Sequence, residues 1–234
     1  MRKIIVAFLS AVILFSCGSN AENKTEKIAA RTSSATATAA VTESFTPYTM
    51  IVVEQPIPTF GLWLPVFNAH DADRRASGLT VLGIGRNIDD SAAVVIRMKA
   101  DEIEKAKEFS KGLKKEMREA GRTVEPKISY LHVLRDDSSY TDSKERAIVS
   151  YHVKDFNSWL KVYDEKGKAA REPHGLIDRG LARGVDDPNT VYILFAISNL
   201  RKARARLASS ELRRILRNAG VDSKMTVRFY KVVQ

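Results

Sequence analysis

The sequence contains very little cysteine: one residue, Cys17, among 234. A single thiol cannot form an internal disulfide, a zinc site with several cysteine ligands or a two-cysteine redox pair. Histidine is also scarce. The four histidines include no pair with the helical spacing of a metal site, such as H-x-x-x-H or H-E-x-x-H. The sequence therefore predicts no metal site, and no cofactor is expected.

Apolar runs long enough to span a membrane are missing as well. At the N-terminus a short basic head precedes an apolar stretch of about a dozen residues, from Ile4 to Phe15, which is too short for a span. These proportions predict an export signal at residues 1–16. The "LFSC" that ends at Cys17 resembles the lipobox of bacterial lipoproteins, which implies cleavage before Cys17 and its lipidation. The alternative is an ordinary secretory signal with an accidental cysteine.

Residues 17–46 contain almost no large apolar side chain before Phe45 and are rich in Ala, Ser and Thr. Such a segment cannot bury enough surface to offset the entropy of ordering, so it is predicted to be a flexible tether of about 30 Å. Gly18 follows the cysteine where an aspartate would favour the inner membrane. The predicted location is therefore the cell envelope, with a lipid anchor at the periplasmic face of the outer membrane.

Acidic residues are outnumbered by basic ones, and the formal charge of +10 becomes +8 once Arg2 and Lys3 leave with the signal. Export argues against nucleic acid as a partner for this basic chain. Much of the excess lies between Arg201 and Arg217, where apolar residues recur at helical spacing. We expect a helix with a solvated basic face there. The alternative is a surface that contacts anionic lipid or an acidic partner.

Three pairs of segments repeat along the chain. "WLPVFNAH" begins at Trp63 and "WLKVYDEK" at Trp159, 96 residues later. Residues 78–98 match residues 175–195 at an offset of 97, and the two "AG" helix ends at 121 and 220 are 99 apart. This drift is typical of small loop insertions between two domain copies, which are much longer than solenoid repeats. The predicted domains are repeat 1 at residues 47–140 and repeat 2 at residues 141–234.

Each copy has the periodicity of strand, helix, strand, strand, helix, strand. In the first copy the predicted elements are strand Tyr48–Glu54, helix Phe60–Arg75, strands Leu79–Arg86 and Ala92–Lys99, helix Asp101–Ala120 and strand Ile128–Leu134. The first helix is expected to turn Trp63, Val66, Phe67 and His70 to one side. This order predicts the α+β class, with two tandem ferredoxin-like units.

A ferredoxin-like unit covers one face of its sheet with helices and leaves the other bare. The third strands, "AVVI" at 93–96 and "VYILFAI" at 191–197, are apolar at successive positions, which indicates cover on both faces. The other copy is the expected cover, so the two sheets should pack face to face. The ten-residue connector from Asp136 to Glu145 spans roughly 33 Å when extended, which permits this docking.

Each copy contains, in this order, W-x-x-x-F/Y, a basic helix end, G-L, a "DD" turn, an apolar strand and a helix ending in A-G. This order resembles the dimeric α/β-barrel superfamily, near the antibiotic biosynthesis monooxygenase-like domains. The resemblance covers about Tyr48–Arg135 and Arg146–Val233. It implies that the barrel, usually formed by two chains, closes within one. Haem-degrading members of this superfamily combine an asparagine, a tryptophan and a histidine. Neither copy has any of the three at the matching places.

Candidate site residues are few. His70 and Arg74 lie one turn apart and are weak candidates for catalysis at a cavity edge. The alternative is that both side chains have only a structural role. Trp63 and Trp159 are candidate ligand contacts, although tryptophans at this spacing are more often core anchors. Arg86 and Arg183, which match between the two copies, are candidate anion clamps or simply hairpin arginines beside turn carboxylates. His132 and His152 are weaker candidates still, and His174 is expected to be solvated.

Two functions remain open. The first is a lipid-anchored, non-catalytic module that binds a small apolar or amphipathic ligand, or a protein partner, between its sheets. The second is a cofactor-independent, monooxygenase-like enzyme that acts on a small organic substrate. Polar groups that converge inside an apolar pocket would favour the enzyme. A larger oligomer is compatible with either function and required by neither.

Overall fold

The computed structural model describes residues 45–119, 121, 124–139 and 141–234, which belong to one compact unit, Glu43–Gln234. Cys17, the predicted signal and most of the predicted tether lie outside these residues. Within the described part of the chain, no helix is both long and apolar enough to cross a membrane.

The first half has the predicted order of elements, with one additional helix. It consists of β1 (Tyr48–Pro56), α1 (Phe60–Ala69), α2 (Asp71–Ala76), β2 (Leu79–Asn87), β3 (Ala93–Ala100), α3 (Ile103–Glu119) and β4 (Lys127–Asp136). The second half consists of β5 (Glu145–His152), α4 (Phe156–Lys166), the 3-10 turns η1 (Lys168–Ala170) and η2 (Glu172–His174), β6 (Leu176–Gly184), β7 (Thr190–Ile197), α5 (Leu200–Ala208), α6 (Ser210–Asn218) and β8 (Thr226–Val232).

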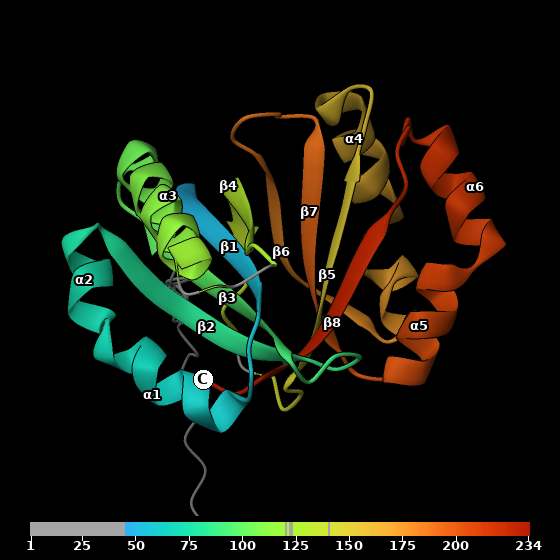
Figure 1. Cartoon of the computed structure of the whole chain (residues 1–234). Helices are drawn as coiled ribbons and strands as arrows, with labels where there is room; N and C mark the ends of the chain where they lie inside the picture. Colours follow the sequence, from blue (N-terminus) through green and yellow to red (C-terminus); the bar gives the residue numbers. More distant parts are fainter. Residues whose placement is uncertain (1–44, 120, 122–123, 140) are drawn as a thin grey trace, which may run out of the picture. The chain divides into compact units, whose positions relative to one another are not determined.

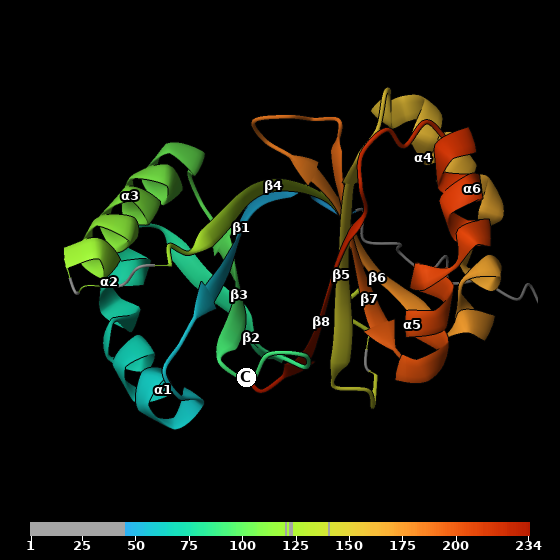
Figure 2. The same cartoon turned by 45° about the vertical axis from the view of Figure 1, so that its right-hand side comes forward.

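The eight strands form one antiparallel sheet that closes into a ring, in the order β1-β3-β2-β8-β5-β7-β6-β4. Two junctions join the halves. β2 pairs with β8 at three positions, and β4 pairs with β6 at five. The helices lie outside the strands, with α1–α3 over the strands of the first half and α4–α6 over those of the second (Figures 1 and 2).

The apolar strands of the sequence are explained by cover on both faces. On β3, Val94 and Ile96 pack under the helices, whereas Val95 belongs to a separate buried cluster inside the ring. That inner cluster draws on both halves: Met50, Val52, Val95, Leu131, Val133, Ala182 and Tyr230. The bare faces of the two half-sheets therefore shield each other from water, as the sequence predicts.

Two expected long helices are instead broken. The helix predicted over Phe60–Arg75 is divided at His70, whose φ of −91° and ψ of 18° end α1 and begin α2. Val66 is 59% exposed, so the predicted one-sided stripe was wrong at that position. The basic helix over 201–217 is divided at Ser209, where an extended backbone and a capping side chain start α6.

Candidate functional site

A cavity lies between the helices and the sheet of the second half. It has a volume of about 120 Å³, and its walls come mainly from α4, α5, α6, β5 and β7. The walls are predominantly apolar, and they include Val149, Trp159, Ile193, Leu207, Leu212 and Leu216. The predicted site, between the sheets, is smaller: the space inside the ring measures about 30 Å³ because side chains fill most of it.

Helix caps place the walls of this cavity. Asp155 accepts a hydrogen bond from the Ser158 N–H at 2.7 Å and starts α4. Trp159 and Tyr163 then lie one turn apart on one face, with their rings stacked at 5.0 Å. Trp159 is only 1% exposed. On the opposite side, the Ser209 cap starts α6, which brings Leu212 and Leu216 to the cavity.

Six side chains with polar groups reach the cavity wall: Tyr151, Tyr163, Lys166, Arg171, His174 and Arg206. Arg171 donates two hydrogen bonds to Asp178, at 2.8 and 2.6 Å, and a third to the Tyr163 carbonyl at 3.2 Å. Its guanidinium carbon lies 4.0 Å from the centre of the Tyr163 ring. The bidentate pair and the cation–π contact fix Arg171 in place.

Burial raises the pKa of the Tyr163 phenol, and the charge of Asp178 raises it further. Burial likewise raises the pKa of Tyr151, another wall residue. Both phenols are therefore neutral at physiological pH and can donate a hydrogen bond. The site offers an apolar surface with a few polar groups, which suits a small organic molecule.

The first half contains a matching arrangement of aromatic rings. Phe60 and Trp63 are 5.8 Å apart, and Trp63 stacks on Phe67 at 4.8 Å. In the second half the distance from Phe156 to Trp159 is 5.7 Å. The interplanar angles also agree, at 42° and 28° in the first half and 40° and 26° in the second.

The arginines next to these rings match too. Arg74 lies 3.8 Å from the centre of the Phe67 ring, where Arg171 lies 4.0 Å from that of Tyr163. Arg86 lies 5.3 Å from the Phe60 ring centre, and Arg183 lies 5.3 Å from that of Phe156. These two arginines, the candidate anion clamps, thus stack on the ring at the start of each first helix.

His70 and Arg74 are not brought together in one cavity. The His70 side chain is 64% exposed and contacts Asp73 at 3.0 Å. Arg74 is buried and donates to the Phe67 carbonyl at 2.6 Å. A surface hollow beside Arg74 is not lined by His70. Because the helix turns at His70, the two side chains face different surroundings.

The remaining candidates divide between the halves. Trp159 lines the cavity, whereas Trp63 packs against the core of the first half. His174, expected to be solvated, lies at the cavity wall. His152 binds Asp222 through Nδ1 at 2.6 Å, at the end of β5. His132 lies on β4, half-buried, and pairs in register with Arg183.

Sequence reasoning missed Tyr163 and Arg171. Arg171 is the counterpart of Arg74 at the repeat offset of 97, so aligning the copies was the signal that would have found it. Across the described residues, no group of three or more metal-binding side chains is present.

The comparisons with known proteins concern the fold. No protein-family model and no curated protein matches the sequence. Among solved structures, a candidate monooxygenase from Fusobacterium nucleatum aligns with a TM-score of 0.50 at 9% identity, covering 80% of this chain and 93% of its own. An anthrone oxidase-like protein aligns with a TM-score of 0.51 at 11% identity, over 80% and 92% of the two chains.

A ferredoxin-fold protein from Listeria monocytogenes, related to antibiotic biosynthesis monooxygenases, aligns with a TM-score of 0.44 at 11% identity, over 78% and 95% of the chains. The first two neighbours, a candidate monooxygenase and an anthrone oxidase-like protein, share the overall fold of this chain. At such low identity the first two alignments establish similarity of fold and nothing about activity.

Proposed function

We propose that this chain is a tandem pair of ferredoxin-like units, anchored to the cell envelope, whose second unit binds a small apolar or amphipathic molecule. The observation that carries this proposal is the apolar cavity between α4–α6 and the sheet, with Tyr163, Arg171 and His174 at its wall. In this first proposal the role is binding alone, without catalysis.

The size of the cavity limits the ligand. Its volume of about 120 Å³ is close to that of an apolar cavity of about 150 Å³ that binds benzene in another protein. A molecule with one ring, such as a phenol, fits this size. The buried phenols and Arg171 supply hydrogen-bond donors for one polar substituent on that ring.

The tandem arrangement is supported by the matched rings and arginines of the two halves. Unrelated segments would have no reason to place an arginine over an aromatic ring at 3.8 and 4.0 Å, 97 residues apart. The alignments to single chains point the same way, because 80% coverage extends beyond one half of this chain. We infer a duplicated unit whose halves complete one α/β barrel.

The membrane anchor rests on the sequence around Cys17. Intact-mass measurement of the protein purified from membranes should show a chain that begins at Cys17 and carries acyl groups. A Cys17→Ala variant should lose these groups and leave the membrane fraction. Recovery of unmodified Cys17 in a soluble, cleaved chain would favour the ordinary secretory signal.

Calorimetric titration of the purified full chain with phenol and with toluene tests the binding site. We expect one saturable site per chain. Leu212→Phe should weaken binding at least tenfold, because Leu212 lines the cavity and the larger ring occupies its space.

Leu113 offers a matched control for this experiment. It is the repeat counterpart of Leu212, is also half-buried, and packs against the core of the first half. Leu113→Phe should leave the affinity unchanged. Equal affinities for the wild type and both variants would place the ligand elsewhere and remove the basis of the proposed function.

An enzyme is the second candidate, because polar groups converge on an apolar cavity and the fold neighbours include monooxygenase-like proteins. The cavity is too small for a three-ring anthrone, so the substrate would be a one-ring phenol or hydroquinone. Oxygen uptake above the uncatalysed rate, lost in Leu212→Phe and retained in Leu113→Phe, would establish the enzyme. Binding without oxygen uptake would support the non-catalytic binding module instead of the enzyme.

A further inference from the structure

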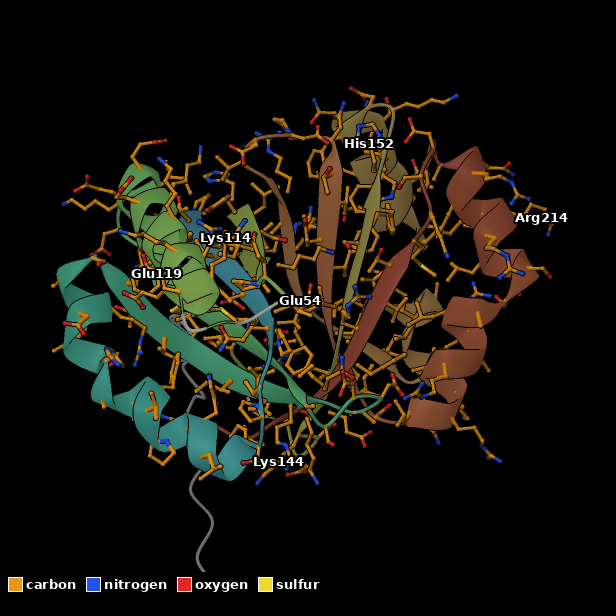
Figure 3. The ribbon with its side chains drawn as sticks, in the orientation of Figure 1. Glu54, Lys114, Glu119, Lys144, His152 and Arg214 are labelled. Atoms are coloured by element: carbon orange, nitrogen blue, oxygen red, sulfur yellow. The ribbon has the colours of Figure 1, made fainter. Side chains whose placement is uncertain are left out.

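The interior of the ring of strands contains two positively charged side chains beside the apolar inner cluster. Arg97 on β3 and Arg146 on β5 are half-buried, and within the described residues neither forms an ion pair with a carboxylate. The nearby carboxylates are already engaged. Glu54 accepts from Arg228 at 2.8 Å, and Asp136 accepts from the Tyr48 hydroxyl at 2.8 Å. Glu54 is labelled on β1 in Figure 3.

Two glycines on β2 make room for a tyrosine ring and for a guanidinium. A side chain at Gly85 would place its Cβ 2.0 Å from Cδ2 of Tyr230, so the Tyr230 ring lies directly over Gly85. A Cβ at Gly83 would lie 3.2 Å from an NH2 group of Arg97, so the Arg97 guanidinium lies over Gly83. Positions two apart on a strand share one face, so Arg97 and Tyr230 are neighbours inside the ring.

Arg146 completes the group from the other side of Tyr230. It is the direct cross-strand partner of Tyr230 in the β5–β8 pairing, so the two side chains leave the sheet on the same face. Arg146 uses one terminal nitrogen to donate to the carbonyls of Ser143 and Glu145, at 2.6 and 2.9 Å. Its other nitrogens donate to no protein acceptor among the described residues.

The Tyr230 hydroxyl is an independent sign of a binding site at this place. Tyr230 is 1% exposed, and among the residues that the structure describes its hydroxyl has no hydrogen-bond partner. A buried hydroxyl without a partner costs free energy, and native proteins usually avoid this or fill it with water or an ion. Burial raises the pKa of this phenol, and the charges of Arg97 and Arg146 oppose that rise. The hydroxyl is a proton donor between two cations.

Space for a small group lies beside Arg97. The cavity inside the ring measures about 30 Å³ and is lined by Arg97, Tyr48, Ile148 and Tyr192, whereas Arg146 and Tyr230 lie outside its wall. That is enough for one water-sized particle or a halide, and too small for an organic ligand. The Gln234 carbonyl oxygen approaches the same position over Gly83, at 3.4 Å from its built Cβ, but it already accepts from the Ile84 N–H at 2.7 Å.

We propose that the interior of the ring binds one small monovalent anion, of halide size, between the guanidinium groups of Arg97 and Arg146 with the Tyr230 hydroxyl as a further donor. The anion neutralises part of the enclosed positive charge and satisfies the unpaired hydroxyl. It therefore links the two halves of the chain, because β3 belongs to the first half and β5 to the second.

Thermal unfolding of the full chain, followed by circular dichroism, tests this site. Sodium bromide replaces sodium gluconate at constant ionic strength, since gluconate is too large to enter. We expect bromide to raise the unfolding temperature of the wild type in a saturable way, by roughly 3 to 6 °C at ten times its dissociation constant. Arg97→Gln and Arg146→Gln should each abolish this rise.

Tyr230→Phe covers the case in which an arginine variant does not fold, because it keeps the ring and removes only the hydroxyl. It should bind bromide about tenfold more weakly than the wild type. Arg214→Gln is the matched control: Arg214 is exposed on the outer face of α6 (Figure 3), and its variant should respond to bromide like the wild type. An unfolding temperature that is equal in bromide and gluconate, or a Tyr230→Phe response equal to that of the wild type, would overturn the proposal.

Discussion

Arg171 and Asp178 hold each other beside the cavity, with side chains only 14% and 17% exposed. Removing one charge of such an enclosed pair leaves the other without its partner. We expect Asp178→Asn to lower the free energy of unfolding by about 3 kcal/mol. Urea denaturation measures this loss.

An exposed pair provides the comparison. Arg204 and Asp89 are 40% and 56% exposed, so solvent screens their attraction. Asp89→Asn should cost no more than about 1 kcal/mol. Similar losses for the two variants would show that the Arg171 pair is solvated and does not stabilise the cavity wall.

His152 makes the stability of the protein depend on pH. A hydrogen bond to Asp222 raises the pKa of His152, although partial desolvation opposes the shift. The unfolded chain has the ordinary value of about 6.5. The stabilisation is therefore complete below about pH 6.5 and disappears as the pH rises through the higher, folded-state pKa.

We expect His152→Asn to destabilise the protein more at about pH 5.5 than at about pH 9, where the imidazole is neutral in both states. Urea denaturation at the two pH values checks the difference. A loss of equal size at both would mean that Asp222 does not stabilise the imidazolium.

At the scale of single elements, the break between α5 and α6 shapes the cavity. The Ser209 hydroxyl accepts from the Leu212 N–H at 3.1 Å and caps α6. Ser209→Ala should reduce the free energy of unfolding by about 1 kcal/mol, because the first turn of α6 loses its acceptor. It should also weaken the binding of phenol, since α6 carries Leu212 and Leu216 to the cavity.

Thr59 is a useful control for this substitution. It occupies the N-cap position of α1, but its side chain makes no capping hydrogen bond. Thr59→Ala should therefore cost less free energy of unfolding than Ser209→Ala when both variants are measured by urea denaturation. If Thr59→Ala costs as much, the loss at Ser209 does not come from its cap.

The helix breaks show why periodicity was only a partial guide to the elements. The strand from Tyr48 and the helix ending near Gly121 were predicted within a few residues, because alternation and apolar spacing report which face is buried. The breaks at His70 and Ser209 were missed because each is set by the backbone angles of one residue. Such a change leaves the apolar spacing of its flanks almost unaltered.

For the whole molecule, closure of the ring depends on the narrow junction between β2 and β8. Gly85 pairs with Val232 there and carries the Tyr230 ring above it. Gly85→Ala would place a methyl group 2.0 Å from that ring, which must then move. We expect a loss of about 3 kcal/mol in the free energy of unfolding, measured with urea.

Gly112 is the matched control, because a Cβ there meets nothing within 4 Å and the residue lies inside α3. Gly112→Ala should stabilise the chain by about 0.5 to 1 kcal/mol through helix propensity. A loss of unfolding free energy in Gly85→Ala and a gain in Gly112→Ala would support the packing of Tyr230 on β2. A neutral Gly85→Ala would show that the ring junction tolerates displacement.

The sequence by itself determined the class of the fold, the sheet faces that needed cover and the lack of cysteine chemistry in the folded part. Side-chain direction follows locally from backbone periodicity, so these features are visible in one dimension. Only the tertiary structure decided where space remains. The helix–sheet cavity and the group of Arg97, Arg146 and Tyr230 arise between segments far apart in the chain, and their volumes depend on how those segments pack.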